Sequence, residues 1–144
     1  MVTNQIEREI TMTQEEKDLL LKDLCARLPY GVAVVLDEKF GFNKAIRTLV
    51  KELLDLYCVE GMKPYLRPMS SMTEEELHEV QEILGKDVEI REVFILIVDS
   101  SINSFSYLEL IAVFDWLNAH HFDYRGLIEK GLAVKVTAEN NPYK

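Results

Sequence analysis

The stretch Leu117-Asn-Ala-His-His-Phe-Asp-Tyr-Arg-Gly-Leu-Ile128 decides how this chain folds, because it joins an apolar segment to a dense group of polar side chains. Two of the three histidines lie in it, together with an aspartate, a tyrosine and an arginine. Such groups must either satisfy one another or face a ligand. Asp123 is placed to cap a short helix over 124–130 that ends before Gly131. With an apolar helix over 107–121 before it, the stretch predicts a helical hairpin.

Three helices are predicted from their first turns. Each begins with the pattern of a capping box, in which a Ser or Thr side chain and a Glu three residues later cap each other's backbone N–H groups. The three pairs are Thr13 and Glu16, Thr73 and Glu76, and Ser106 and Glu109. Pro29 ends the first helix, and Gly85 is placed to end the second, which runs over 74–84.

Short runs of β-branched and aliphatic residues predict strands at 32–36, 93–98 and 132–137. The segment 62–68 contains two prolines four residues apart, which excludes a helix interior and predicts extended chain. The segment 44–59 is compatible with two structures. Its apolar spacing favours a helix, whereas its β-rich C-terminal end favours a pair of strands.

These elements predict one α+β domain over residues 13–139, with three to four helices and a small antiparallel sheet. Residues 1–12 are interpreted as a flexible N-terminal leader and 140–144 as a C-terminal tail. A chain of 144 residues suits a single domain, and its 48% hydrophobic residues supply a core for it.

Three features of the sequence predict a cytoplasmic protein without a membrane partner. The longest apolar run, 93–98, has six residues, whereas a membrane helix needs about 18–20. The N-terminus lacks the apolar core and the cleavage site of a signal peptide. Cys25 and Cys58 both stand in apolar surroundings, which is typical of buried thiols that stay reduced in the cytosol.

The net charge of −9 is unevenly spread along the chain. Residues 68–115 hold eleven acidic and two basic residues, whereas residues 39–67 hold six basic and three acidic residues. Nucleic-acid binding relies on clustered Lys and Arg side chains that neutralise phosphates. The acidic excess therefore argues against a nucleic-acid partner, and the simplest interpretation of both segments is solvated surface.

His120, His121 and Asp123 form the first candidate site. Imidazole and carboxylate groups bind divalent metals, but adjacent residues on a helix point about 100° apart, so neighbouring histidines rarely reach one ion. We therefore predict no metal and no cofactor. The competing interpretation is structural: Asp123 caps the following helix, and one histidine closes the preceding helix by meeting its free carbonyl groups.

The same cluster also has the chemistry of an acid–base pair, formed by His121 and Asp123 with Tyr124 or Ser106 nearby. A nucleophile needs its own setting, and the chain has no Gly-x-Ser-x-Gly elbow. The apolar surroundings of the two cysteines would raise a thiol pKa instead of lowering it. We therefore assign no catalytic residue, and the sequence favours a protein that is not an enzyme.

Two further groups of side chains are candidate binding residues. Lys63, Tyr65 and Arg67 alternate along extended chain, so we expect them on one face, where they could bind an anion or stack on a nucleotide ring. The second group holds residue types that dominate protein–protein hot spots: Trp116, Tyr124 and Arg125.

Three motifs carry a resemblance to a known group of proteins. They are the segments 20–31, 59–76 and 115–133, which contain Leu-Cys-Ala-Arg-Leu-Pro-Tyr-Gly at 24–31, Met-Lys-Pro-Tyr-Leu-Arg-Pro at 62–68, and Trp-Leu-Asn-Ala-His-His-Phe-Asp-Tyr-Arg-Gly-Leu at 116–127. Together they resemble small uncharacterised proteins of Bacteroides-type gut bacteria and of their phages and mobile elements. The resemblance implies a cytoplasmic, mobile-element setting, a start near Met12, and a short β-meander that favours strands at 44–59. That group has no assigned activity, so it implies no functional residue.

The sequence thus predicts a non-enzymatic interaction or accessory factor of phage or mobile-element origin that binds a host or phage protein, with self-association left open. The alternative is a small-molecule or nucleotide-binding module, or an enzyme, built around His120, His121 and Asp123. A pocket joining these side chains would favour the alternative.

Overall fold

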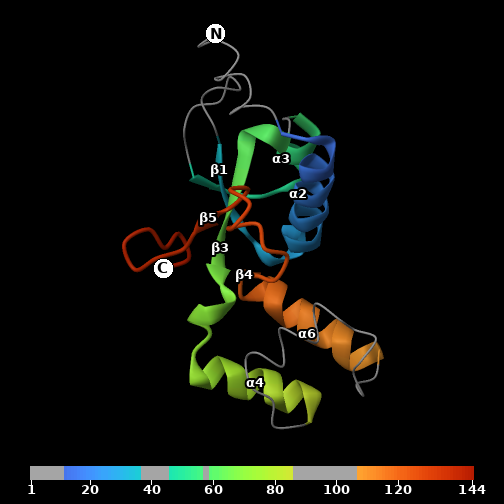
Figure 1. The fold of residues 1–144 in the computed structure, drawn as a ribbon, viewed down its shortest axis with the longest axis vertical. Coiled ribbons are helices and arrows are strands. Elements are labelled where there is room, and N and C mark those ends of the chain that lie inside the picture. Colours follow the sequence, from blue (N-terminus) through green and yellow to red (C-terminus); the bar gives the residue numbers. More distant parts are fainter. Residues whose placement is uncertain (1–11, 37–45, 57–58, 86–106) are drawn as a thin grey trace.

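The computed structural model describes residues 12–36, 46–56, 59–85 and 107–144. In these ranges the chain has the predicted α+β class, with helices packed around a small sheet (Figure 1). The sheet and one long helix lie at one end of the molecule, and two further helices lie at the other end. None of the helices in the described ranges has the length and apolar character that a membrane span needs.

The first long helix, α2, runs over Gln14–Arg27 and begins as predicted, because the Thr13 and Glu16 side chains form both hydrogen bonds of a capping box. Pro29 follows in a short 3-10 turn, η1 (Leu28–Tyr30). Gly31, at φ 70°, then turns the chain into the sheet in a backbone conformation that favours glycine.

The sheet is mixed, with the strand order β2-β1-β3-β4 and with β5 also paired to β3. Its strands are β1 (Ala33–Leu36), β2 (Ile46–Thr48), β3 (Met62–Pro68), β4 (Phe122–Asp123) and β5 (Val134–Lys135). Strand β1 pairs antiparallel with β2 and with β3, whereas β4 and β5 run parallel to β3. The predicted antiparallel pairing is confirmed for β1, β2 and β3, whereas the parallel pairing of β4 and β5 with β3 was not predicted. Between β3 and β4 the described residues of the chain include the helices α4 and α6, and such a crossover delivers a parallel strand.

The segment 44–59 combines parts of both predicted structures. After β2, Leu49 donates its N–H to the Val32 carbonyl at 2.8 Å, and a short helix, α3 (Lys51–Leu56), follows. A 3-10 turn, η3 (Val59–Gly61), leads into β3. The predicted strand pair was thus wrong in its second half, where the helically spaced Leu53 and Leu54 pack against the core.

Helices α4 (Glu74–Leu84) and α6 (Tyr107–Ala119) form the second layer of the molecule. A 3-10 turn, η4 (Met69–Ser71), joins β3 to α4. The capping box of Thr73 and Glu76 and the C-cap at Gly85, with φ 66°, are both confirmed. The predicted strand at 93–98 and the Ser106 capping box lie outside the described residues.

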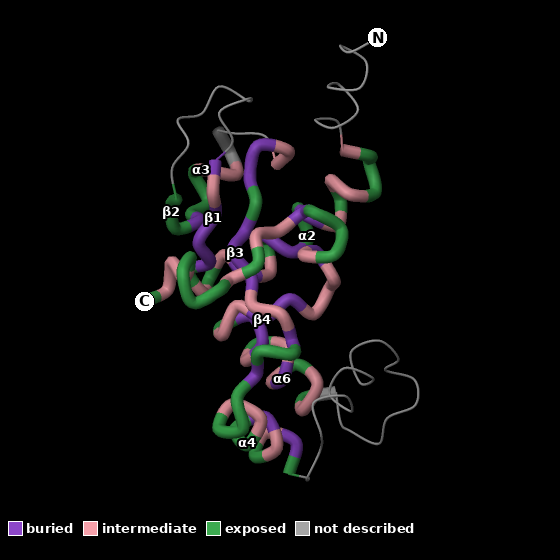
Figure 2. Tube along the Cα trace, turned by 60° about the vertical axis from the view of Figure 1, so that its left-hand side comes forward, coloured by how far each residue is buried: buried purple, intermediate pink, exposed green. Residues whose placement is uncertain are grey.

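Two hydrophobic clusters make up the core, and the buried parts of the tube in Figure 2 follow them. The first joins α2 to the sheet around Leu20, Leu24 and Val34. The second lies between α4 and α6 and includes Val80, Leu117 and Phe122. Phe122 belongs to β4, so this short strand brings the second cluster to the sheet.

The predicted helix over 124–130 is wrong, because these residues form turns. Both carboxylate oxygens of Asp123 accept backbone N–H groups, from Leu127 at 2.9 Å and from Ile128 at 3.0 Å. Asp123 therefore has the predicted capping role, but it caps a turn. Strands β4 and β5 both pair with β3, so the residues between them must keep the chain close to β3. A helix of two turns would carry the chain about 10 Å away from it.

Candidate functional site

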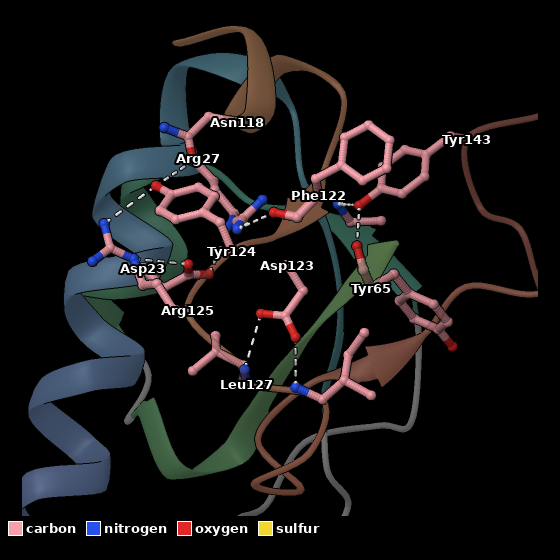
Figure 3. A network of polar contacts seen from close by, with 12 residues as sticks. Asp23, Arg27, Tyr65, Asn118, Phe122, Asp123, Tyr124, Arg125, Leu127 and Tyr143 are labelled. Carbon is pink, nitrogen blue, oxygen red and sulfur yellow. Dashed lines mark hydrogen bonds and ion pairs between the residues drawn. The ribbon is translucent and has the colours of Figure 1, made fainter. Parts of the chain in front are cut away.

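A fully buried ion pair lies between the two hydrophobic clusters (Figure 3). Asp23 and Arg27 are one turn apart on α2, both have 0% exposure, and Arg27 Nε donates to Asp23 Oδ2 at 2.7 Å. Arg27 Nη2 also donates to the Phe122 carbonyl at 2.6 Å. A buried charge is tolerated only when it is paired and hydrogen-bonded, so this contact fixes α2 against β4.

A second arginine reaches the same carboxylate from the turn after β4. Arg125 Nε donates to Asp23 Oδ1 at 3.1 Å, and its side chain remains partly exposed. Its Nη2 lies 3.3 Å from the hydroxyl of Tyr124, which donates to Asn118 Oδ1 at 2.8 Å. The network therefore joins α2, α6 and the turn around one aspartate, as Figure 3 shows. Tyr124 and Arg125 were predicted from the sequence as binding residues, whereas Asp23 and Arg27 were not predicted.

His120 closes helix α6, as the structural interpretation predicted for one of the histidines. Its Nδ1 lies 2.9 Å from the Trp116 carbonyl in the last turn of the helix, and the same carbonyl accepts the backbone N–H of His120 at 3.0 Å. Its ring stacks on the Trp116 indole with centroids 4.0 Å apart. The Trp116 Nε1 donates to Glu79 Oε2 at 3.0 Å, which ties this side of α6 to α4.

His121 turns the chain from α6 into β4. Among the described residues it is the one non-glycine with positive φ, at 63°, and its carbonyl accepts the Arg67 N–H at 2.8 Å. Its ring stacks on Tyr143 with centroids 3.7 Å apart and the planes within 5°. Burial lowers the pKa of His121 to about 4, assisted by the positive charges of Arg27, His120 and Arg67. The imidazole is therefore neutral at physiological pH and is poorly matched to general acid–base catalysis there.

Tyr143 completes the sheet at the point where β1 and β3 separate. Its hydroxyl accepts the Ala33 N–H at 3.0 Å and donates to the Tyr65 carbonyl at 2.6 Å, so it bridges the two strands (Figure 3). Tyr143 was predicted to lie in a tail, because a lone aromatic residue after Asn-Asn-Pro shows no periodicity that would predict its packing against the sheet. Burial raises the pKa of Tyr143 to about 12, so the hydroxyl keeps its proton.

We expect Tyr143→Phe to lower the free energy of unfolding by about 1–3 kcal/mol, because it removes only the hydroxyl and leaves the Ala33 N–H and the Tyr65 carbonyl without that partner. Urea unfolding would measure the change. Tyr30→Phe is a matched control, since the Tyr30 hydroxyl is less buried and does not bridge strands. Equal decreases in the free energy of unfolding for the two variants would show that the bridge between β1 and β3 does not contribute the stability assigned to it.

The candidate residues on β3 do not form one open face. Lys63 is exposed, whereas Tyr65 is only 8% exposed and belongs to the core. Arg67 forms two 2.7 Å hydrogen bonds to the Glu76 carboxylate, and its guanidinium lies 4.1 Å from the centre of the Phe122 ring. Burial alone would raise the pKa of Glu76, but Arg67 and the Thr73 N–H hold it at about 2.

The His120, His121 and Asp123 side chains do not converge on a common ligand position. His120 faces Trp116, His121 faces Tyr143, and Asp123 faces the turn that it caps. No three His, Cys, Asp or Glu side chains within the described ranges could hold a metal ion together. A half-open hollow of about 370 Å³ lies near Asp123, but neither histidine lines it. Its lining residues are Pro68, Met69, Ser70, Asp123, Gly126, Ile128, Glu129 and Lys135.

Comparison of the chain with protein-family models, with curated proteins and with solved structures gave no match. Its function is therefore inferred from the arrangement of its own residues.

The lowered pKa of His121 predicts a loss of stability in mild acid. The unfolded chain binds a proton at this residue below about pH 6.5, whereas the folded protein binds it only near pH 4. The stabilisation is therefore complete above pH 6.5 and is lost as the pH falls towards 4, by about 1–2 kcal/mol once the partly exposed ring is allowed for.

His121→Asn tests this directly, because asparagine tolerates positive φ and does not titrate. Urea unfolding between pH 4.5 and 6.5 should show a flatter pH dependence for the variant than for the wild type. This window lies above the range in which Glu76 protonates, which runs from its ordinary pKa of 4.5 down to about 2. Parallel curves for the two proteins would contradict the assignment to His121.

Proposed function

We propose that this protein acts by binding another protein and that it is not an enzyme. The observation that carries the proposal is the outer side of α6. Leu108 is 77% exposed and Ile111 is 41% exposed, and a separation of three residues places them side by side on the helix surface. Large apolar side chains that stay in water next to aromatic and Arg residues are typical of protein-binding surfaces.

Two of the predicted hot-spot residues lie beside the C-terminal half of the same helix, where Tyr124 contacts Phe114 and Asn118 and Arg125 contacts Tyr124. Asp115 lies one turn after Ile111, and burial together with a hydrogen bond to Asp115 raises the pKa of Tyr30 on the neighbouring turn. Tyr124 packs edge-on against Phe114 on the same flank, with ring centroids 5.2 Å apart. We call the patch formed by the following residues the α6 surface: Leu108, Ile111, Asp115, Tyr124 and Arg125.

Trp116, the third predicted hot-spot residue, points away from the α6 surface. It is two positions from Phe114 along the helix, which corresponds to a rotation of about 200°. Its contacts with His120 and Glu79 lie towards α4. The proposal therefore keeps Tyr124 and Arg125 and assigns Trp116 to the packing between α4 and α6.

The chemistry of the histidine cluster also supports binding over catalysis. His120 and His121 stack on aromatic rings, and both oxygens of Asp123 accept backbone N–H groups. The resemblance to proteins of Bacteroides-type bacteria and their phages favours a host or phage protein as the partner, and the cytoplasm as the place where they meet.

Photo-crosslinking in cells tests the proposal. A benzoylphenylalanine at position 108 or 111 should give one and the same discrete adduct when the protein is expressed in a Bacteroides-type bacterium. The matched control position is Leu21, which is 43% exposed on α2 outside the α6 surface. The adduct should disappear in a Tyr124→Ala, Arg125→Ala variant that is still folded by circular dichroism. Equal adducts at position 21, or adducts unaffected by the double substitution, would refute the proposal.

The hollow beside Asp123 is the observation that favours the alternative, a small-molecule site. Thermal unfolding in the presence of nucleotides and divalent metal ions separates the two functions. A bound ligand at about 100 times its Kd would stabilise the fold by about 2.7 kcal/mol, and the melting temperature would rise by several degrees. We expect no such shift, and a rise that Lys135→Ala and Glu129→Ala abolish would favour the alternative.

A further inference from the structure

The hollow beside Asp123 is a second place where this protein offers a binding site. Its lining comes from the end of β3, the start of η4, the turn after β4 and the end of β5. Because β4 and β5 both pair with β3, the sheet holds these segments together. The volume of about 370 Å³ lies near the lower end of the roughly 300–1,000 Å³ of ligand pockets, so the hollow suits a small ligand.

Part of the lining of the hollow is apolar. Met69 is 7% exposed and belongs to the second hydrophobic cluster, whereas Ile128 packs against the first. Gly126 leaves room in the same lining, because a Cβ atom added to it would meet no described residue within 4 Å. An apolar ligand side chain held against these residues would be withdrawn from water, which favours binding.

Asp123 brings a negative charge to this lining that the described residues do not neutralise. The residue is only 8% exposed, and its carboxylate accepts two uncharged backbone N–H groups (Figure 3). No Lys, Arg or His side chain in the described part of the chain forms an ion pair with it. Buried carboxylates usually have a cationic partner, and an ionised carboxylate has acceptor sites for more than two donors. An ammonium group of a ligand would supply the missing positive charge.

Two exposed side chains of opposite charge also line the hollow, Glu129 from the turn and Lys135 from β5. Within the ranges that the structure describes, neither charged group forms an ion pair with the other or with a third residue. Opposite charges that share a hollow without meeting each other are complementary to a ligand that carries both charges. Charge-assisted hydrogen bonds would then join a ligand ammonium group to Glu129 and a ligand carboxylate to Lys135.

We propose that the hollow binds a zwitterionic amino acid with a large apolar side chain. The ammonium group lies towards Asp123 and Glu129, the carboxylate towards Lys135, and the apolar side chain against Met69 and Ile128. A nucleotide is disfavoured there, because the two acidic side chains repel its phosphates. A divalent metal ion would find only two carboxylates in the lining, and no group of three metal-binding side chains occurs within the described ranges. None of the lining residues belongs to the α6 surface, so this binding is independent of the proposed protein binding.

Small ligands that differ by one group test the proposal. The probe is L-phenylalanine. The controls are 2-phenylethylamine, which lacks the carboxylate, 3-phenylpropionate, which lacks the ammonium group, and L-alanine, which lacks the ring. By isothermal titration calorimetry we expect L-phenylalanine to bind at least about tenfold more tightly than each control, because only it satisfies both charges and the apolar lining. Equal affinity for L-phenylalanine and any control, or no detectable binding at about 10 mM, would overturn the proposal.

Single substitutions assign each charge of the ligand to one side chain. Lys135→Gln should weaken the binding of L-phenylalanine about tenfold and leave that of 2-phenylethylamine unchanged, because only the first ligand has a carboxylate. Glu129→Gln should weaken both of these ligands and leave 3-phenylpropionate no weaker. The matched controls are Lys130→Gln and Glu139→Gln, which change exposed charges outside the hollow and should have no such effect. Equal losses in the controls would contradict the assignment.

Filling the hollow is an independent test of its location. Gly126 has φ 75°, and asparagine tolerates this conformation better than other side chains do. Gly126→Asn should therefore keep the fold, which thermal unfolding without ligand would check, and should abolish the binding of L-phenylalanine. Undiminished binding in a folded Gly126→Asn variant would place the ligand elsewhere and refute the site. Crosslinking of a partner at position 111 should be the same in this variant and in the wild type.

Discussion

Arg27→Met should lower the free energy of unfolding by about 3–5 kcal/mol, a large fraction of the stability of a domain of this size. The substitution leaves the fully buried Asp23 carboxylate without its main partner and removes the donor to the Phe122 carbonyl. Methionine has a similar length and is apolar, so the loss reports on the charge pair more than on packing volume. Urea unfolding measured at pH 7 would give the change.

Arg125→Met is the matched control, because Arg125 binds the other oxygen of the same aspartate from a partly exposed position. We expect it to cost about 1 kcal/mol or less, as partly exposed ion pairs do. The double variant Asp23→Leu, Arg27→Met should recover much of the loss, since a buried pair replaced by apolar residues is often neutral. Equal costs for Arg27→Met and Arg125→Met would contradict the role given to the buried pair.

Phe122→Ala should also lower the free energy of unfolding by about 3–5 kcal/mol. The ring is fully buried between α4 and α6, with the Trp116 ring 5.7 Å away on one side and the Arg67 guanidinium 4.1 Å away. Alanine would open a cavity in the second hydrophobic cluster and remove the surface on which the guanidinium lies. Chemical unfolding and near-ultraviolet circular dichroism of Trp116 would both report the change.

Phe114→Ala is the matched control for Phe122→Ala, because Phe114 lies on α6 and packs against the same hydrophobic cluster but is only partly buried. Phe114→Ala should lower the free energy of unfolding about half as much as Phe122→Ala, because Phe114 buries less apolar surface. If both substitutions lowered the free energy of unfolding equally, the residues around β4 would have closed the cavity, and the close packing assigned to Phe122 would be wrong.

Local patterns of the sequence predicted the helix starts well. The capping boxes at Thr13 and Thr73 depend on residues three positions apart, so a neighbourhood of a few residues determines them. The C-cap at Gly85 and the extended segment at 62–68 depend on the same kind of short-range backbone preference. The capping role of Asp123 was predicted in the same way, although the residues that it caps form a turn and not the predicted helix.

Features set by distant contacts were missed. The chain turns at 124–130 because β4 and β5 must both pair with β3, which no pattern within the turn reveals. The buried pair did leave a signal. Asp23 and Arg27 fall on the same helix stripe as Leu20 and Leu24, and charged residues at core positions usually pair with each other.

The position of β4 and β5 late in the chain makes the order of synthesis matter for this sheet. Strand β3 pairs with β1 on one side, and β4 and β5, which are synthesised much later, pair with it as well, so part of β3 stays uncovered in the nascent chain. An open strand edge is a template for pairing with other chains. A ribosome stalled before β4 and β5 would thus display a sheet prone to aggregate, and a chaperone that shields nascent edges would be needed most in that interval.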